Sequence, residues 1–301
     1  MKILVLLSTY NGEKYLRELL ESLKAQTVDN LEILVRDDDS SDGTKEILEE
    51  YSKQGSLSWY EGKNLGATKS FWHLLQHCGD ADYYAFCDQD DVWDRDKLEA
   101  AVKMLEKEAK ERPILYCSDV RVVDENLEVM SETMVVPTPM DYPHALVRNV
   151  APGCTYVMNR AAKELLCQYD AQVHGMELHD WFTYQVTACF GKVIYDATTH
   201  LSYRQHQENE IGDIRNQRKR WLGKLKSFWS GPMKNSREKN ALRLETVYGA
   251  QMTSKAKEIT AIFAHYREEK SYRKALRNRK EFQLSGVESI FFKLLILFRR
   301  L

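Results

Sequence analysis

Short apolar runs alternate with stretches of helical periodicity along the first 120 residues of the chain. The helical stretches place apolar side chains every three or four residues, as in 13–25, where Leu16, Leu19, Leu20 and Leu23 share one face. Predicted strands cover 2–7, 31–36, 83–87 and 113–118, and predicted helices cover 13–25, 44–53, 67–77 and 94–111. This alternation is typical of an α/β fold, a mostly parallel sheet flanked by helices on both faces.

The second half of the chain has a different pattern. The signal is weak from about 120 to 150, and after it we predict strands at 154–158, 192–196 and 199–203 and helices at 160–168 and 180–190. Beyond residue 205 the chain is helical and basic. We therefore divide it into an α/β domain, 1–212, and a helical basic C-terminal region, 213–301.

Polar loops follow three of the predicted strands. The loops are 8–12, 36–44 and 88–91, and the last two are rich in carboxylates. Ligands of parallel sheets bind beyond the carboxyl ends of the strands. The three loops together therefore predict one ligand site at this edge of the sheet.

The loop Asp88-Gln89-Asp90-Asp91 is the most specific of these signals. Crowded carboxylates repel one another, and hard oxygen ligands at a strand end suit Mg²⁺ or Mn²⁺ bridged to substrate phosphates. The alternative is a solvated acidic turn before the next helix, which Asp94 could cap without any metal.

The second acidic loop contains Asp37, Asp38 and Asp39. Asp and Ser side chains here can cap the following helix, which is the structural interpretation. A carboxylate can instead accept the imide N–H of a uracil or thymine ring, while Tyr10 offers a flat face to the base. Both interpretations stay open at this point.

Four further residues are candidates in weaker contexts. Lys69 suits a phosphate but is equally a solvated helix charge. Asp180 opens a helix in His179-Asp180-Trp181, where an acid also favours the helix dipole. Arg204 and His206 end a short strand and could face a diphosphate or a metal, or be structural.

The composition excludes several classes of protein. With 301 residues and 43% hydrophobic residues, the chain can bury a core, and no run approaches the roughly 20 apolar residues of a membrane span. The short apolar start at 1–7 does not fit a signal peptide, so we expect a cytoplasmic chain. Six scattered cysteines without a C-x-x-C pair favour buried thiols over zinc or disulfides. No G-x-x-x-x-G-K-[ST] phosphate loop is present.

The ordered set of motifs resembles glycosyltransferase family 2, inverting enzymes with the GT-A fold, over roughly residues 1–206. The motifs are Ser8-Thr9-Tyr10-Asn11-Gly12, Asp37-Asp38 with Ser40-Ser41-Asp42-Gly43-Thr44, Asn64-x-Gly66 and Asp88-x-Asp90-Asp91. The second half is similar to the bacterial polysaccharide rhamnosyltransferases, through Gly153-Cys154-Thr155, His179-Asp180-Trp181 and Tyr203-Arg204-Gln205-His206. Asp39 departs from the family, which usually has glycine there.

The resemblance implies roles for the candidate residues. Donor binding would fall to Ser8, Tyr10, Asp38, Lys69, Asp88, Gly153 and Arg204, metal binding to Asp90, Asp88 and His206, and the general base would be Asp180. Ser8 and Tyr10 would hold the base and ribose, and Asp38 would accept from the pyrimidine N3–H. The expected cofactor is Mg²⁺ or Mn²⁺, because a leaving nucleoside diphosphate gains negative charge.

These roles imply transfer of a sugar from a nucleotide donor, dTDP-rhamnose or a UDP-sugar, to a lipid-linked saccharide in bacterial cell-surface polysaccharide synthesis. L-rhamnose is the expected sugar. The alternatives are a UDP-hexose-dependent transferase of the same fold and a non-catalytic scaffold that binds nucleotide-sugar or membrane. Asp90 and Asp180 argue against the scaffold, because binding alone needs no second carboxylate on the acceptor side.

The basic C-terminal part of the chain, 201–301, leads to an expectation about membrane binding. Residues 1–200 hold 20 Lys and Arg against 35 Asp and Glu (−15), whereas 201–301 hold 23 against 10 (+13). Residues 214–229 interleave aromatic and basic side chains, and 286–301 are strongly apolar. We expect these segments to bind an anionic membrane surface, which would place the protein on the inner face of the cell membrane. They could instead pack on the catalytic domain or on a second subunit, and nucleic acid is not expected.

Overall fold

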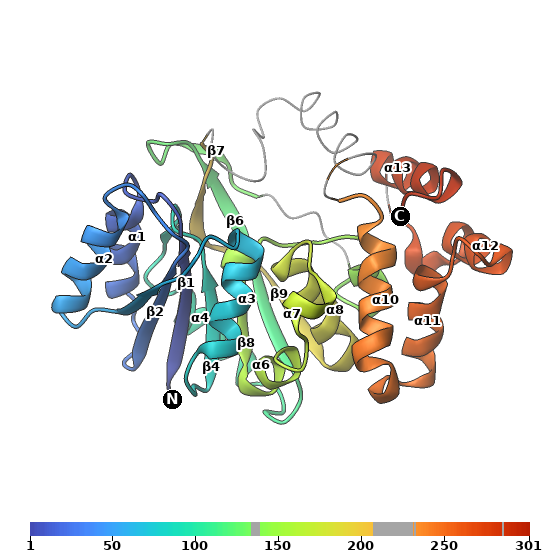
Figure 1. Cartoon of the computed structure of the whole chain (residues 1–301), viewed down its shortest axis with the longest axis horizontal. Helices are drawn as coiled ribbons and strands as arrows, with labels where there is room; N and C mark the ends of the chain where they lie inside the picture. The colour runs from blue at the N-terminus through green and yellow to red at the C-terminus, as the bar shows by residue number, and fades with distance from the viewer. Residues whose placement is uncertain (134–138, 207–230, 232, 285) are drawn as a thin grey trace.

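One twisted sheet forms the centre of the computed structural model, which describes residues 1–133, 139–206, 231, 233–284 and 286–301 (Figure 1). The strands among these residues are β1 (Ile3–Thr9), β2 (Leu31–Asp37), β3 (Ser58–Glu61), β4 (Tyr83–Cys87), β5 (Val92–Trp93), β6 (Ile114–Val123), β7 (Val129–Ser131), β8 (Val157–Asn159) and β9 (Lys192–Arg204). Their order across the sheet is β3-β2-β1-β4-β8-β6-β9-β5, and β7 pairs with β6.

The sheet is mixed. Strands β1–β4 form a parallel block, in which β1 pairs with β2 and β4, and β2 pairs with β3. Strand β8 then runs antiparallel to β4 and β6, while β6 and β9 are parallel to each other. The parallel block brings the loops after β1, β2 and β4 to one edge, as expected for carboxyl ends that point the same way.

Helices cover both faces of the sheet. The helices and 3₁₀ turns are α1 (Leu16–Lys24), α2 (Thr44–Lys53), α3 (Ala67–His77), α4 (Lys97–Leu105), α5 (Tyr142–Val147), η1 (Gly153–Thr155), α6 (Arg160–Leu166), α7 (Ala171–His174), α8 (His179–Phe190), α10 (Ser236–Tyr248), η2 (Gly249–Gln251), α11 (Ser254–Ala264), α12 (Lys270–Asn278), η3 (Lys280–Phe282) and α13 (Gly286–Leu297). Alternate residues of β1 separate the two cores: Ile3, Val5 and Leu7 pack with α1, α2 and α4, whereas Leu4 and Leu6 pack with α3, α6 and α8.

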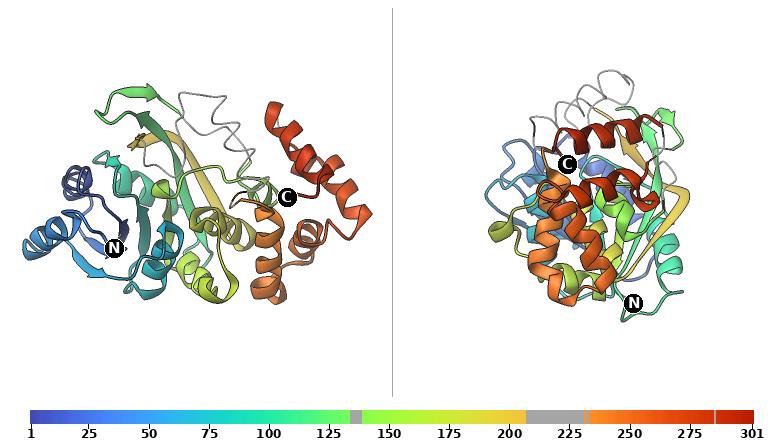
Figure 2. Two further views of the ribbon diagram at one scale, coloured as in Figure 1. Left: turned by 45° about the horizontal axis from the view of Figure 1, so that its top comes forward. Right: turned by 90° about the vertical axis from the view of Figure 1, so that its right-hand side faces the viewer.

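The C-terminal helices α10–α13 lie together at one end of the molecule, with α10 nearest to α8 (Figures 1 and 2). Their buried side chains, among them Leu244, Phe263 and Phe292, join the same apolar cluster as Phe182 of α8. This region therefore shares a core with the sheet. The boundary expected near residue 212 and the segment 214–229 lie outside the described residues.

The α/β fold class with a helical C-terminal region is confirmed, and most predicted elements match. Helices α2 and α3 and strand β4 have the predicted bounds. Three details were wrong. The helix expected at 94–111 is only Lys97–Leu105, because β5 precedes it. Residues 154–155, expected at the start of a strand, belong to a 3₁₀ turn. The two strands expected at 192–196 and 199–203 are one strand with register shifts. No helix of the described residues is long and apolar enough to cross a bilayer.

Gly191, which ends α8, gives a test of the packing between α8 and β6. A Cβ atom at this position would lie 1.8 Å from the backbone oxygen of Pro113, so the backbone would have to move. We predict that Gly191→Ala lowers the free energy of unfolding by at least about 2 kcal/mol, measured by urea denaturation. Gly79→Ala is the control, because its Cβ would meet nothing within 4 Å. Equal urea midpoints for the two variants would contradict the packing.

Candidate active site

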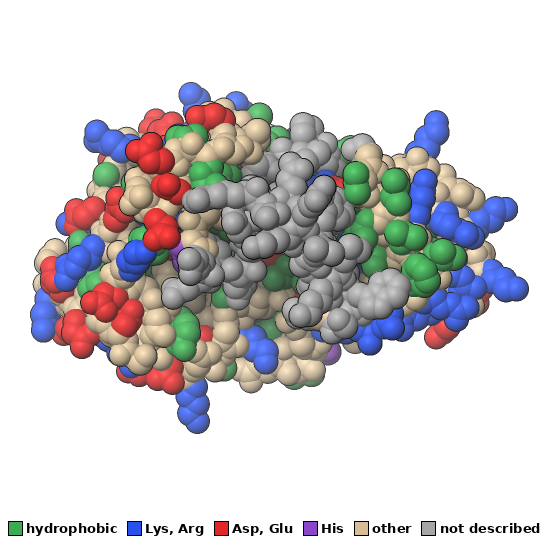
Figure 3. All heavy atoms as spheres, turned by 90° about the horizontal axis from the view of Figure 1, so that it is seen from above, with side chains coloured by type: hydrophobic (Ala, Val, Ile, Leu, Met, Phe, Trp, Pro, Cys, Tyr) green, Lys and Arg blue, Asp and Glu red, His purple; other side chains and the backbone are tan. Residues whose placement is uncertain are grey.

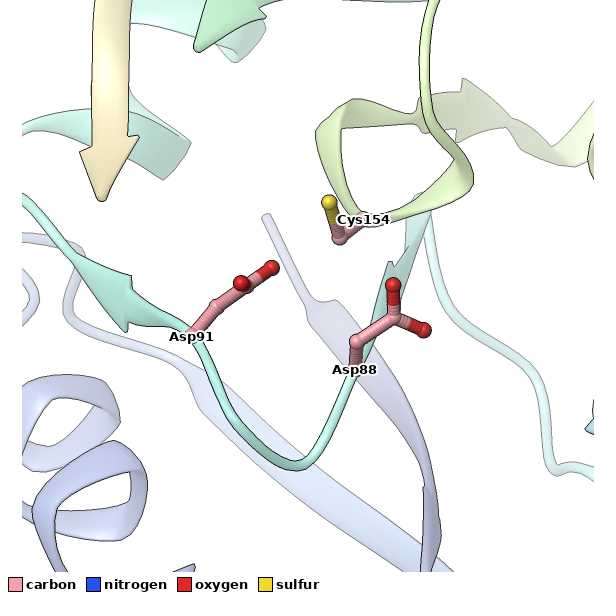
Figure 4. Close-up of side chains that lie close together, drawn as sticks. All are labelled: Asp88, Asp91 and Cys154. Atoms are coloured by element: carbon pink, nitrogen blue, oxygen red, sulfur yellow. The ribbon is translucent and has the colours of Figure 1, made fainter. Parts of the chain in front are cut away.

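The loop after β4 carries the acidic cluster. The ligand atoms of Asp88, Asp91 and Cys154 lie within 4.8 Å of one another, with Cys154 supplied by the turn η1 (Figure 4). Asp91 and Cys154 are fully buried. Burial, together with the neighbouring Asp90 and Asp88 carboxylates, raises the pKa of Asp91 well above its ordinary value, and burial also raises the pKa of the Cys154 thiol.

Asp90 and His206 form a separate pair. The Nε2 atom of His206 lies 2.7 Å from Oδ2 of Asp90, and both side chains are only slightly exposed. The three predicted metal ligands are therefore divided: Asp88 belongs to the cluster with Asp91 and Cys154, while Asp90 and His206 contact each other.

The donor set fits a divalent cation at the outer side of this loop. Metal ligands must be deprotonated, and hard cations prefer oxygen. The buried thiol of Cys154 and the carboxyl of Asp91, with their raised pKa values, are poor ligands for such an ion. Asp88 and Asp90 would supply the carboxylate oxygens instead, with His206 beside Asp90.

Two cationic side chains lie behind the acidic loop. Arg204 is buried; its Nε donates to the backbone oxygen of Asp90 (2.8 Å), its Nη1 to that of Glu125 (2.6 Å) and its Nη2 to Glu18 (2.5 Å). The buried ammonium of Lys97 lies 3.4 Å from the centre of the Trp93 ring, and burial lowers its pKa to about 8. Part of the charge compensation that the sequence assigned to a metal thus comes from the protein itself.

Asp38, the predicted pyrimidine ligand, is buried and fully engaged within the protein. It pairs with Arg36, and its oxygens accept the backbone N–H groups of Leu65 (2.9 Å) and Gly66 (2.8 Å). The sequence analysis did not assign a role to Arg36. A cation near the end of a mostly apolar strand was the one feature that could have pointed to it. Asp38 therefore ties β2 to the loop before α3.

The remaining donor-side candidates surround this point. Ser8 hydrogen bonds to Ser70 of α3 (2.6 Å), which also accepts from Arg36. Tyr10 is half exposed, and its backbone N–H donates to Oε1 of Gln89 (2.8 Å), so the first loop is fixed to the acidic loop. Lys69 is exposed on α3.

Asp39 occupies a left-handed backbone position, with φ of 72°. The family resemblance has glycine here, and this conformation explains the preference, since glycine adopts it without a steric cost. Aspartate is among the residues that tolerate the left-handed region best. The loop therefore keeps its shape despite the departure.

Asp180 begins α8 on the other side of the turn η1. Its carboxylate accepts the backbone N–H of Trp181 (2.6 Å) and the side-chain amide of Asn149 (2.8 Å). Burial raises the pKa of Asp180 to about 6, and these hydrogen bonds, with one from the Gly153 backbone, oppose the rise. Asn149 was not identified from the sequence, because it lies in the irregular segment between 120 and 150.

Gly153 lets η1 approach α8 closely. A Cβ atom on Gly153 would lie 3.0 Å from Cβ of Asp180 and 3.1 Å from Nε2 of His179. The next residue, Cys154, contacts Asp88 and Asp91. One 3₁₀ turn therefore lies between the acidic loop and Asp180.

The side chain of His179 packs against its neighbours and is not suited to act as a base. Its ring stacks on Phe71 with 4.3 Å between centroids, and burial lowers its pKa to about 3. The ring is therefore neutral throughout the physiological pH range.

Comparison with known proteins relates part of the chain to a known family. Residues 4–134 match the family model described as glycosyl transferase family 2. These residues belong to that family. A dTDP-rhamnosyl transferase, RfbG of Shigella flexneri, is 29% identical over 222 residues, which are 68% of this chain and 73% of the relative.

Solved structures show the same GT-A fold. The S. aureus TarS fragment 1–349 in complex with UDP-GlcNAc aligns with 99% of this chain and 80% of that chain, at a TM-score of 0.59 and 16% identity. The mannosyltransferase PcManGT of Pyrobaculum calidifontis, in complex with GDP-Man and Mn²⁺, aligns with 97% of this chain and 87% of its own, at a TM-score of 0.50. The predicted family and fold are confirmed.

If Asp180 is the general base that the family resemblance implies, its pKa of about 6 predicts the pH profile of transfer. Asp180 accepts a proton only when ionised, so kcat should rise with pH and reach half its maximum near pH 6. Asn149→Ala removes a hydrogen bond that stabilises the ionised form, and should move this midpoint up by roughly one pH unit. Asn30→Ala, at an exposed position of the α1–β2 loop, should not move it. A midpoint near pH 4, or none that responds to Asn149→Ala, would contradict the assignment.

Proposed function

We propose that this chain transfers L-rhamnose from dTDP-rhamnose to a lipid-linked saccharide in the synthesis of a bacterial cell-surface polysaccharide. The similarity to the Shigella flexneri dTDP-rhamnosyl transferase, which extends over 68% of the chain, supports the donor. The catalytic part is carried by one observation: η1 has Asp180 on one side, through Gly153, and the acidic loop on the other, through Cys154.

The reaction follows from these positions. The acceptor hydroxyl oxygen forms a bond to the anomeric carbon of the donor, while the bond from that carbon to the diphosphate oxygen breaks and its electron pair stays on the diphosphate. Asp180 takes the hydroxyl proton. Because attack and departure occur on opposite faces, the anomeric configuration inverts.

The donor side stabilises the leaving group. Asp88 and Asp90, with His206 beside them, would hold a Mg²⁺ or Mn²⁺ ion, which neutralises charge that develops on a nucleoside diphosphate. Tyr10 remains half exposed next to Gln89, where its ring can lie against a base. Through its hydrogen bonds, Asp38 would shape the loop before α3. To contact the pyrimidine N3–H, it would have to give up one of its two backbone N–H partners.

Donor hydrolysis without acceptor tests the proposal. Wild-type protein with Mn²⁺ should release dTDP from dTDP-rhamnose and much less nucleotide from UDP-glucose or UDP-GlcNAc. Asp90→Asn should lower this release about 100-fold or more with an unchanged melting temperature, because it removes charge where the diphosphate leaves. Asp80→Asn is the matched control, since the Asp80 side chain is 85% exposed.

The other outcomes are also informative. Release from a UDP-hexose alone would overturn the rhamnose assignment and keep the transferase. Binding of nucleotide-sugars in a thermal-shift assay without any release would favour the non-catalytic scaffold. Full activity of Asp90→Asn in EDTA would overturn the metal site.

Helix α13 supports a position at the membrane. One stripe of it, Phe292, Leu295 and Ile296, is buried against the protein, and a second apolar stripe faces outward. The exposed residues of this second stripe are Val287, Ile290, Leu294, Leu297 and Phe298. Figure 3 shows apolar side chains among Lys and Arg at this end of the molecule, the pattern of a helix that lies on an anionic bilayer surface. Packing on the catalytic domain thus applies to the inward face of α13, and membrane binding is proposed for its outward face.

We predict that the protein sediments with vesicles that contain phosphatidylglycerol, less so at high salt, and not with pure phosphatidylcholine vesicles. Replacing two residues of the outward stripe, Ile290→Ser with Leu294→Ser, should reduce the bound fraction several-fold, because it removes buried apolar area. Val173→Ser, at an exposed valine on α7, should leave binding unchanged. Equal sedimentation of all three forms would contradict membrane docking through α13.

A further inference from the structure

A pocket of about 180 Å³ opens between the α/β domain and the C-terminal helices. One wall comes from the segment after α5 and the start of α8, and the other from the C-terminal region. The lining residues are Arg148, Asn149, Leu178 and Trp181 on the first wall, and Met233, Arg237, Leu284, Glu288, Phe291 and Phe292 on the second.

The pocket lies next to the proposed base. Asn149 lines it and donates its side-chain amide to Asp180 (2.8 Å), and Trp181 follows Asp180 in α8. One side chain therefore separates the pocket from the carboxylate that would take the acceptor proton. None of the residues of the loops 8–12, 37–44 and 88–91 lines this pocket, so it is separate from the donor side.

The lining combines apolar surface with a few fixed polar groups. Arg148 pairs with Glu288 of α13 (2.6 Å), which joins the two walls. The buried guanidinium of Arg237 donates through Nε to the backbone oxygen of Val147 and lies 5.6 Å from the centre of the Trp181 ring. These contacts hold the charged side chains in defined positions before any ligand arrives.

This chemistry suits a sugar. A pyranose ring presents an apolar C–H face, which packs on aromatic side chains, and hydroxyls, which need a small number of placed donors and acceptors. The pocket volume of about 180 Å³ lies below the roughly 300–1,000 Å³ of pockets that enclose drug-sized ligands, which favours a ligand as small as one sugar ring.

We propose that this pocket binds a single sugar ring of the acceptor, and that α13 forms one wall of the acceptor site. The proposal rests on the proposed function, since it takes Asp180 as the base. A ring whose C–H face lies against Trp181 and Phe291 would direct its hydroxyls toward Asn149 and the Arg148–Glu288 pair. The outward stripe of α13 is left available for another contact.

The test uses full-length protein and a panel of octyl monosaccharides: octyl rhamnoside, octyl glucoside and octyl N-acetylglucosaminide. Phe291→Ala removes part of the apolar wall, and Glu288→Gln breaks the ion pair. For whichever glycoside serves as acceptor, each variant should raise the acceptor KM about tenfold or more. Donor hydrolysis without acceptor should stay within twofold of wild type. Val173→Ala, at an exposed position of α7 away from the pocket and from α13, should change neither.

A binding measurement separates this proposal from the proposed function. Saturation-transfer NMR should detect the sugar protons of the same glycoside on wild type and Val173→Ala, and lose them on Glu288→Gln and Phe291→Ala. Circular dichroism checks that each variant is folded, and Glu288→Gln decides the matter if Phe291→Ala unfolds. Turnover with an unchanged acceptor KM in the folded variants would overturn the pocket and leave the transferase. Pocket-dependent binding without turnover on any donor would overturn the transferase and leave the pocket. No glycoside signal on wild type would overturn the pocket.

Discussion

The guanidinium of Arg204 is the interaction on which the site depends most. It is buried at the end of β9 and connects the backbone of Asp90, the backbone of Glu125 and the side chain of Glu18, while it lies 4.5 Å from the centre of the Tyr15 ring. Three segments distant in sequence are thereby fixed around the acidic loop. A carboxylate cluster held this way keeps its geometry without a ligand, which lowers the cost of reorganisation when charge develops during reaction.

The sequence predicted the N-terminal half well because its signals are local. Strands β1, β2 and β4 are apolar runs that end in polar loops, and their parallel pairing brings those loops together. The later elements depend on distant partners. Strand β8 has only three residues and is defined by pairing with β4 and β6, and β9 reads as one strand only because β6 supports it across its irregular register. No pattern within either segment encodes those partners.

The sequence predicted which residues gather at the site, but it did not predict what each of them contacts there. Asp38 matches a family motif, yet its neighbours Arg36, Leu65 and Gly66 occupy its oxygens. Asp90 and Asp91 are adjacent in sequence, but one contacts His206 and the other is buried beside a thiol with a raised pKa. Burial and partners, which separate these carboxylates, come from residues far along the chain, such as Cys154 and Asn149. Sequence spacing alone could not assign them.

The two faces of α13 set a length scale for the acceptor. A helix with its side chains is about 10–12 Å across. With the outward stripe on a bilayer and the inward side on the pocket, the pocket would lie about one such diameter above the lipid headgroups. An acceptor sugar that reaches it would then belong to the first few units from the lipid, and a long glycan would carry its growing end past the site. Under these two proposals the thickness of one helix sets the distance between the acceptor pocket and the membrane. This distance favours an early step in chain assembly over the extension of a finished polymer.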